Sequence, residues 1–433
     1  MGKHIGHTDT RKTTNNIQHT MKHLFSFTLA AALLCSAAGF PAQGGERKKK
    51  DEPQPQKIAL GVWDDVDKDA TVEEIIEWMA PFDQAGIKNY YMCGTPEETA
   101  RYIEAAKAYP GAKIHAWMFS MNAPGDSVAY QHPEWFDVNR LGNNSLEYDP
   151  YVKHYKWLSP SSPGARQHVK EKAAALAALD GLASVHLDFI RYNDAILGRQ
   201  LQRDKFHIEQ DTYRAEYDFG YHPEAIEKFK AIFGYSPLEL KQPWLSPEWL
   251  QFRLNEVSSL VNEIVAETHA AGKQVSAAVF PYPTRARMTV YQDWPAWDID
   301  IVCPMNYNSF YLEGIDWIGF SVENGVRETQ GKNLYVSGLF VPDLSAEELY
   351  RAAKLSIEKG AKGVNFFNAR SLLRGDKLKA VDRINPEFNL QQQTRPRREA
   401  PLGNRSKEAS GRDFLSHTRY GLLDSTHPCR RPL

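Results

Sequence analysis

Short runs of apolar residues alternate with longer amphipathic stretches from Lys57 onward. Such an alternation is typical of βα units arranged around a parallel sheet. The predicted strands are Ile58–Trp63, Ile87–Met92, Lys113–Phe119, Ser184–Ile190, Gln274–Phe280, Ile299–Met305, Asn333–Phe340 and Lys362–Phe367. Eight strands with helices between them predict a (β/α)8 TIM barrel of the α/β class.

Three of the segments between these strands begin with the spacing of a capping box, in which a hydroxyl caps an amide three residues on and a carboxylate reaches back. The pairs are Thr71 with Glu74, Thr95 with Glu98, and Ser345 with Glu348. Ser246 and Pro247 open a further helix, which we expect to run through Val265 with Gly272 just past its end.

An open, doubly wound sheet is the alternative fold for this pattern. Such a sheet carries a glycine-rich phosphate turn after its first strand, but here Trp63-Asp64-Asp65 stands in that place. The barrel is therefore the preferred prediction.

Two connections are longer than a βα loop requires. They run from Ser120 to Ala165 after the third predicted strand and from Asn193 to Leu245 after the fourth. Both follow the C-terminal ends of strands, so in a barrel both lie at the face where active sites are built. Both are rich in aromatic residues, and we expect them to form walls of a groove, or alternatively a small subdomain packed on itself.

The two ends of the chain do not share this pattern. Residues 1–20 fit neither a signal peptide nor a domain, and translation from Met21 would remove them. A basic start, an apolar centre and small residues before a cleavage point after Ala38 predict a signal peptide. The expected segments are the signal peptide at 21–38, a linker at 39–56, the barrel at 57–390 and a disordered tail at 391–433.

A signal peptide predicts an exported protein, periplasmic or extracellular. Its apolar run is shorter than the roughly 20 residues that cross a bilayer, so no stable membrane insertion is expected. Cys35 is a possible site of lipid attachment, but Leu34 is bulky where a small residue is preferred. A lipoprotein anchor is therefore the less favoured interpretation.

Composition narrows the function classes. A net charge of -2 provides no overall attraction for nucleic acid, and no nucleic-acid partner is predicted.

The four cysteines define no disulfide framework and have no His at zinc-ligand spacing, so we predict no metal and no cofactor. The aromatic content of 12% suits a large core as well as stacking on sugar rings. The oligomeric state stays open.

The fourth predicted strand places a carboxyl group inside the barrel. Because side chains alternate along a strand, the apolar positions 185, 187 and 189 should face the helices. His186 and Asp188 then point into the lumen, with Asp188 near the C-terminal mouth. There Asp188 is suited to act as nucleophile, base or electrostatic stabiliser of a developing cation. The alternative is a buried structural Asp paired with Arg191.

The segment Val185–Tyr192 resembles the fourth-strand signature of the glycosyl hydrolase-like 10 barrels, also called family 10 glycosylhydrolase-like proteins. Further segments fit the same family in chain order: His132–Trp135, Trp157–Pro163, Val275–Phe280 and Asp300–Tyr307. The resemblance covers about Lys57 to Leu373, and the ordered set is what makes it specific. It implies a barrel that handles carbohydrate and, with less force, a hydrolytic activity.

Pro304–Tyr307 also resembles the sixth-strand Met-x-Tyr of chitinase-type barrels, which implies that Met305 and Tyr307 face the sugar. Ordinary core packing is the alternative for both residues. Tryptophans near the mouth are further expected to stack on pyranose rings. The predicted substrate-binding residues are His186, Arg191, Tyr192, Trp63, Trp117, Trp157, Asn306 and Tyr307.

A glycosidase normally needs two carboxyl groups, roughly 5 to 10 Å apart. The fifth predicted strand ends in Phe280, without the Glu that many related amylase-like barrels carry there. Asp64 and Asp65 are the preferred partners of Asp188 because they directly follow a predicted strand, although either could be a helix cap or a solvated charge. Weaker candidates are Glu134, Asp149 and Asp293.

Three functions fit these residues. The first is an exported glycoside hydrolase that acts on a polysaccharide or oligosaccharide, with Asp188 as its essential carboxylate. The second is a catalytically silent carbohydrate-binding barrel, which the missing Glu on the fifth strand favours. The third is a metal-dependent hydrolase that uses Asp64, Asp65, His186 and Asp188, but sequence spacing alone establishes no ligand cluster.

The predicted boundaries can be tested by truncation. Residues 43–56 and those beyond about Gln391 have no apolar periodicity with which to join a core, so a protein reduced to Lys57–Gln391 should fold cooperatively. Thermal unfolding of this protein and of the mature chain should give the same transition. Loss of the transition in the shorter protein would contradict these boundaries.

Overall fold

The computed structural model describes residues 58–149 and 151–384. Eight parallel strands close into a barrel in chain order, with β8 pairing back onto β1. Their bounds are β1 Ala59–Asp65, β2 Asn89–Cys93, β3 Lys113–Phe119, β4 Ser184–Asp188, β5 Gln274–Val279, β6 Ile301–Pro304, β7 Leu334–Phe340 and β8 Gly363–Phe367. The predicted barrel is confirmed. The predicted signal peptide, linker and tail, together with Cys35, lie outside the described residues.

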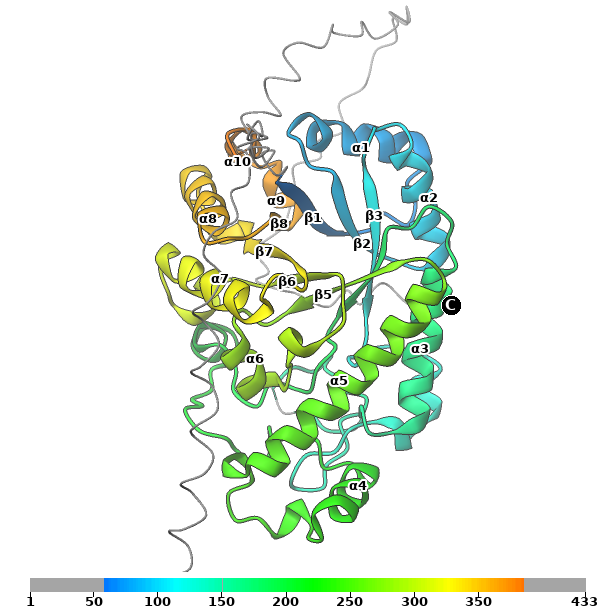
Figure 1. Cartoon of the computed structure of the whole chain (residues 1–433), viewed down its shortest axis with the longest axis vertical. Helices are drawn as coiled ribbons and strands as arrows, with labels where there is room; N and C mark the ends of the chain where they lie inside the picture. Colours follow the sequence, from blue (N-terminus) through cyan, green and yellow to red (C-terminus); the bar gives the residue numbers. More distant parts are fainter. Residues whose placement is uncertain (1–57, 150, 385–433) are drawn as a thin grey trace, which may run out of the picture. The chain divides into compact units, whose positions relative to one another are not determined.

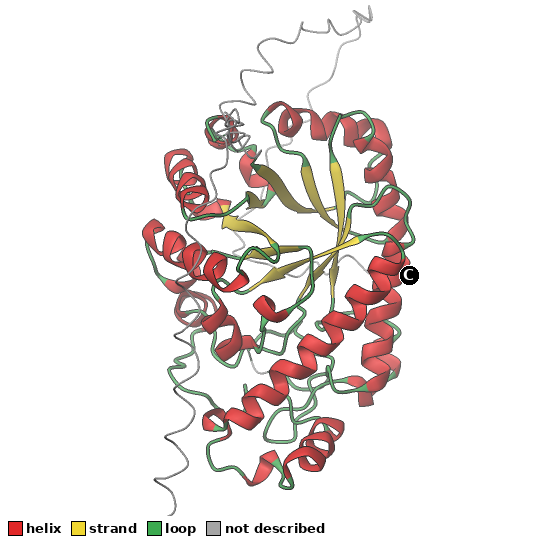
Figure 2. Cartoon of the chain, in the orientation of Figure 1, coloured by secondary structure: helices red, strands yellow, loops and turns green. Residues whose placement is uncertain are grey.

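Helices surround the strands, as Figures 1 and 2 show. They are α1 Val72–Gln84, α2 Pro96–Ala106, α3 Pro163–Ala177, α4 Pro223–Phe233, α5 Pro247–Ala270, α6 Pro283–Val290, α7 Ile315–Thr329, α8 Ala346–Glu358, α9 Ala369–Leu372 and α10 Lys377–Asp382. The three predicted capping boxes are present at the starts of α1, α2 and α8. Helix α5 starts after Ser246 as predicted but continues to Ala270, and Gly272 beyond it has a φ of 73°. None of the described helices is long and apolar enough to cross a membrane.

The strand side chains divide between two apolar clusters. Leu60 and Val62 of β1 belong to the large cluster that packs the strands against the helices. Trp63, the next residue of β1, points to the opposite face and belongs to a smaller cluster with Tyr91 and Trp117. The members of this smaller cluster come from alternate positions of the strands. This alternation places the second cluster inside the barrel.

Strand β1 is longer than the sequence predicts. It continues through Asp65, so Asp64 and Asp65 lie within the strand rather than after it. Successive strand residues point to opposite faces. Asp65 therefore shares the lumen face with Trp63, whereas Asp64 shares the helix-facing side with Val62.

Strand β4 ends at Asp188, and the prediction that it continues to Ile190 is wrong. Phe189 has a φ of 51°, in the left-handed region through which a strand does not continue. Its ring consequently does not face the helices as the alternation predicted. It packs against Phe119 at the end of β3, with ring centroids 4.7 Å apart.

The segments after β3 and β4 pack on each other. Residues 120–162 separate β3 from α3, and residues 189–222 separate β4 from α4. Within the first segment Phe136 pairs with Leu158, and Asn139 pairs with Phe219 of the second segment. Helix α4 lies beside the start of α5 (Figure 1), where Phe229 and Trp249 share a small apolar cluster.

Close packing inside the barrel predicts a specific intolerance at Gly338 of β7. A Cβ added there would lie 2.8 Å from the Trp63 ring and 2.9 Å from the carbonyl oxygen of Pro304. Gly338→Ala should lower the free energy of unfolding by about 1–3 kcal/mol, measured by urea denaturation. Gly314 is the control, because an added Cβ meets no heavy atom within 4 Å, and Gly314→Ala should cost clearly less. Equal losses would contradict this packing account.

Candidate active site

Asp188 is the last residue of β4 and is paired in register with Phe119 of β3. Its side chain is held at the C-terminal mouth of the barrel and is only 8% exposed. One carboxylate oxygen accepts a hydrogen bond from Trp117 Nε1 at 3.2 Å, and the other accepts one from the backbone N–H of Phe189 at 2.7 Å. Each oxygen therefore has a fixed donor that favours the charged form.

Burial raises the pKa of Asp188 from 3.8 to about 6. The hydrogen bond from Phe189, the positive charge of Arg191 and the hydrogen bond from Trp117 oppose this rise but do not cancel it. A carboxyl group that changes its charge near pH 6 can serve either as an anion or as an acid in an enzyme.

Aromatic rings supply the apolar surroundings of Asp188. Trp117 lies 6.0 Å from Phe119 and 6.3 Å from Phe367, measured between ring centroids. Tyr307, which follows β6, lies 6.1 Å from Phe367. The pKa of Tyr307 is far above its ordinary value because of burial, and the charge of Asp188 adds to this shift. Tyr307 and Asp188 therefore interact at the same mouth.

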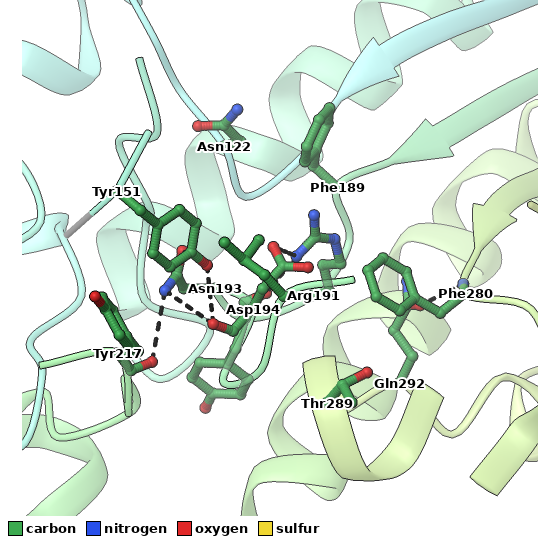
Figure 3. A network of polar contacts seen from close by, with 12 residues as sticks. Asn122, Tyr151, Phe189, Arg191, Asn193, Asp194, Tyr217, Phe280, Thr289 and Gln292 are labelled. Carbon is green, nitrogen blue, oxygen red and sulfur yellow. Dashed lines mark hydrogen bonds and ion pairs between the residues drawn. The ribbon is translucent and has the colours of Figure 1, made fainter. Parts of the chain in front are cut away.

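Arg191 is buried beside the mouth and forms its ion pair with Asp194, at 2.9 Å. The structure thus contradicts the interpretation of Asp188 as the structural ion-pair partner of Arg191. The guanidinium also lies over the rings of Trp157, Phe189 and Phe280, at 4.7, 5.2 and 4.9 Å. Figure 3 shows Arg191 between Phe189 and Phe280, with its group turned to Asp194. This environment favours a role in holding the loop over direct contact with substrate.

The loop after β4 is fixed by further hydrogen bonds (Figure 3). The Tyr151 hydroxyl donates to the backbone oxygen of Asp194 at 2.8 Å and lies 3.1 Å from Asn193 Oδ1. Gln292 Nε2 donates to the backbone oxygen of Ile190 at 3.3 Å, and its Oε1 accepts from the backbone N–H of Phe280 at 2.9 Å. These bonds connect the loop to the connection after β3 and to the segment after α6, so the mouth has a rigid wall on this side.

His186 lies beside Trp63 and is completely buried. Its Nε2 accepts a hydrogen bond from Trp63 Nε1 at 2.9 Å, and its Nδ1 is 2.8 Å from Ser276 Oγ. Burial, with some contribution from His115, holds the pKa of His186 well below its ordinary range. Both nitrogens of this neutral ring are occupied. The geometry therefore favours a structural role for His186, which was predicted to bind substrate.

The two acidic residues of β1 differ in their surroundings. The Asp64 carboxylate accepts a hydrogen bond from the backbone N–H of Arg370 at 3.1 Å, at the start of α9. Burial raises its pKa to about 6, while the charge of Arg370 opposes the shift. These contacts favour a capping role for Asp64. Asp65 is half-buried on the lumen face and remains a candidate for the second carboxyl group beside Asp188.

Five residues predicted to bind substrate are closed to solvent. Trp63 is 2% exposed, Trp157 and Tyr192 are each 1% exposed, and His186 and Asn306 are 0% exposed. Asn306 donates to Ser337 Oγ at 2.9 Å. The expectation that Trp157 offers an exposed ring near the mouth is wrong, because that ring is covered by Arg191 and neighbouring aromatic residues.

The described residues contain no group of three or more His, Cys, Asp or Glu side chains placed to hold a metal ion. The four ligands of the metal hypothesis do not converge: Asp64 faces the helices and His186 is bonded through both nitrogens. These contacts disfavour a metal-dependent hydrolase with these four ligands.

A family model described as Glycosyl hydrolase-like 10 matches residues 97–326, more than half of the chain. The chain belongs to this family. The match includes β3 to β6 and both long connections, and therefore also Asp188 with the aromatic residues around it.

Solved structures show that this family member has the fold of several glycosidases. The PgaB (BpsB) glycoside hydrolase domain from Bordetella bronchiseptica is 13% identical, with a TM-score of 0.56 over 76% of this chain and 99% of that one. The catalytic domain of β-amylase from Paenibacillus polymyxa is 11% identical, with a TM-score of 0.56 over 79% of this chain and 99% of that one. At such identities the likeness concerns the fold alone. No curated protein matches the chain.

The sequence does not predict several residues that shape this glycosyl hydrolase-like mouth. Phe119 and Phe367 end β3 and β8, and the sequence pattern predicts them only as core residues. Asp194 pairs with Arg191 at a spacing of three residues, a signal that the sequence does contain.

The raised pKa of Asp188 predicts a pH-dependent contribution to stability. Its folded-state pKa of about 6 exceeds the ordinary 3.8, so folding favours the protonated form. The contribution is complete below about pH 4 and is lost as the pH rises through about 6, on the order of 3 kcal/mol in all. The unfolding free energy of Asp188→Asn minus that of the unmodified protein should therefore rise from pH 4 to pH 7.5.

Urea denaturation of both proteins at the two pH values measures this difference. The titration of Asp64 cancels because both proteins contain it. A difference that does not change with pH would show that Asp188 is not held in a dry environment.

Proposed function

We propose that the protein is an exported glycoside hydrolase that acts on a polysaccharide or oligosaccharide, with Asp188 as its essential carboxylate. The observation that carries the proposal is the position of Asp188. It lies at the C-terminal end of a barrel strand, where TIM-barrel enzymes build their sites, with two N–H donors on its oxygens and aromatic rings around it. The family and the fold agree with this proposal.

In this proposal Asp188 acts as an anion, either as nucleophile or as the group that stabilises an oxocarbenium-like transition state. Both of its hydrogen bonds come from N–H donors, which favour the carboxylate. The dry surroundings strengthen its interaction with a developing positive charge. Trp117 and Tyr307 provide ring surface and, through the Tyr307 hydroxyl, a donor for a sugar hydroxyl.

Asp65 is the proposed second carboxyl group. It is the lumen-facing residue at the end of β1, and it is partly accessible, as an acid that protonates a leaving group must be. Asp64 is not proposed for this role because its carboxylate is bonded to the start of α9.

The export part of the proposal depends on the signal peptide predicted for residues 21–38. A glycan partner follows from the proposed chemistry. A carbohydrate-binding barrel without activity is the competing function, favoured by the absence of Glu at the end of β5, which continues into Phe280 and Pro281.

Asp188→Asn preserves the shape of the side chain and removes its charge. Turnover of a glycan substrate should fall about a thousandfold or more, equivalent to roughly 4 kcal/mol of barrier, because the transition state loses its counter-charge. In the unmodified protein kcat/KM should rise with pH with a midpoint near 6, the pKa of Asp188, and fall at higher pH where the proposed acid Asp65 loses its proton. Steady-state kinetics between pH 4 and 8 measure both effects.

Asp300→Asn is the matched control. Asp300 lies just before β6, at the opposite end of the barrel, where its carboxylate accepts from the Val275 backbone N–H at 2.8 Å. This variant should retain turnover within a few-fold. A kcat/KM that falls through pH 6 would make Asp188 the acid instead, and near-full activity of Asp188→Asn would move the chemistry elsewhere. Binding without cleavage across a broad glycan panel would favour the binding barrel.

A further inference from the structure

A cavity of about 400 Å³ lies away from Asp188, between the connections that follow β3 and β4. Its lining comes from the 3-10 segment Pro133–Trp135 and from the first residues of α3 and α4. The volume falls within the range of small-ligand sites, roughly 300–1,000 Å³. Two of the segments that carry the family resemblance, His132–Trp135 and Trp157–Pro163, meet at this cavity, although the proposed reaction uses neither.

Trp135 is held in a defined position at the cavity wall. The His132 ring stacks on it, with centroids 3.9 Å apart and planes inclined by 6°. Its indole nitrogen lies so close to Gly164 that a Cβ at that residue would overlap it. Trp135 is half-buried and lines the cavity, with the His168 ring 5.5 Å from it between centroids. A pre-positioned indole is suited to pack against the C–H face of a sugar ring.

The polar groups of the cavity disfavour an anionic ligand. Both helix starts are already capped, α3 by Ser162 and α4 by the buried ring of His222. His222 Nε2 donates to the backbone oxygen of Glu134 at 2.7 Å, so the ring joins the two connections. The carboxylates of Glu134 and Glu224 are exposed at the lining and repel negative charge, and Glu134 Oε1 is 2.9 Å from His132 Nδ1. They can accept hydrogen bonds from hydroxyl or ammonium groups.

The cavity and the mouth lie on the same wall. Phe136, next to Trp135, pairs with Leu158. The neighbouring Trp157 packs on Phe189, which directly follows Asp188, with ring centroids 5.9 Å apart. The proposed course of a glycan chain from the mouth to Trp135 follows this connection.

From these observations we infer that the cavity is a second carbohydrate-binding site, which takes a unit of a neutral or positively charged glycan outside the site at Asp188. The inference rests on the proposed function in that the same polymer is expected at both sites. Trp135 provides the stacking surface, and Glu134 and Glu224 provide the hydrogen-bond acceptors at the edge. The site adds affinity for long chains, which can occupy it and the mouth at once.

Binding is tested on the full chain carrying Asp188→Asn, so that no ligand is consumed. The probes are cellohexaose, maltohexaose, N-acetylated chitohexaose, its deacetylated form and hexagalacturonate, titrated by calorimetry. At least one neutral or cationic hexasaccharide should bind, and Trp135→Ala should weaken that binding about tenfold. Glu224→Gln, which leaves the indole in place, should weaken it by a smaller factor. Hexagalacturonate should bind least.

Trp244→Ala is the matched control. Trp244 is also half-buried, in the segment between α4 and α5, and stacks on one ring, that of Tyr213, but it does not line the cavity. This variant should bind as the parent does. Unchanged binding in Trp135→Ala overturns the inference, as does the absence of any binding by the hexasaccharides or preferred binding of hexagalacturonate.

Activity separates this inference from the proposed function. If the unmodified protein cleaves a polysaccharide and a short oligosaccharide, Trp135→Ala should reduce kcat/KM on the polymer about tenfold more than on the short substrate. An equal loss on both would place Trp135 in the active site or the fold and overturn the inference. If the unmodified protein cleaves nothing, the proposed activity fails, while the binding measurements still decide the second site.

Discussion

A closed barrel excludes water from the side chains inside it, so the polar groups there have to bond to one another. In this protein several of them form one directed chain. The Trp63 indole can only donate, which makes His186 Nε2 an acceptor and its Nδ1–H the donor to Ser276. Ser276 and Ser184 continue the chain at 2.8 Å to the buried ring of His115 at 2.7 Å, which lies 3.2 Å from Asn89. Five neighbouring strands are joined in this way.

The position of the candidate site depends on that chain. His186 and Asp188 are two residues apart on β4 and point to the same face, so the bonds that hold His186 also set the height of Asp188 at the mouth. Both imidazole rings are neutral, since burial holds the pKa of His115 near 3 and that of His186 well below its ordinary range. A neutral chain can stay buried without a counter-ion. The buried charge that needs stabilisation at the mouth is then the Asp188 carboxylate.

The regular part of this architecture could be predicted from the sequence, because alternation of apolar residues and helix capping are local signals. All eight strands, the capping boxes and the inward face of Asp188 follow from such signals. The loop contacts could not be predicted in the same way. The left-handed turn at Phe189 and the burial of Trp157 under Arg191 depend on packing between the connections after β3 and β4, which are far apart in the chain. The sequence therefore predicts Trp157 as a stacking surface for sugar, whereas the structure buries it in the core.

The energetics of Asp188 bear on the choice between an enzyme and a passive barrel. A buried carboxylate with a pKa of about 6 destabilises the folded protein at neutral pH. Arg191 could have neutralised it but is held by Asp194 instead, with its guanidinium enclosed by aromatic rings. A barrel that only binds neutral sugar gains little from such a charge, since a neutral amide can donate and accept hydrogen bonds at lower cost. Stabilising a transient positive charge requires an anion in dry surroundings, and the structure retains one at the mouth despite its cost.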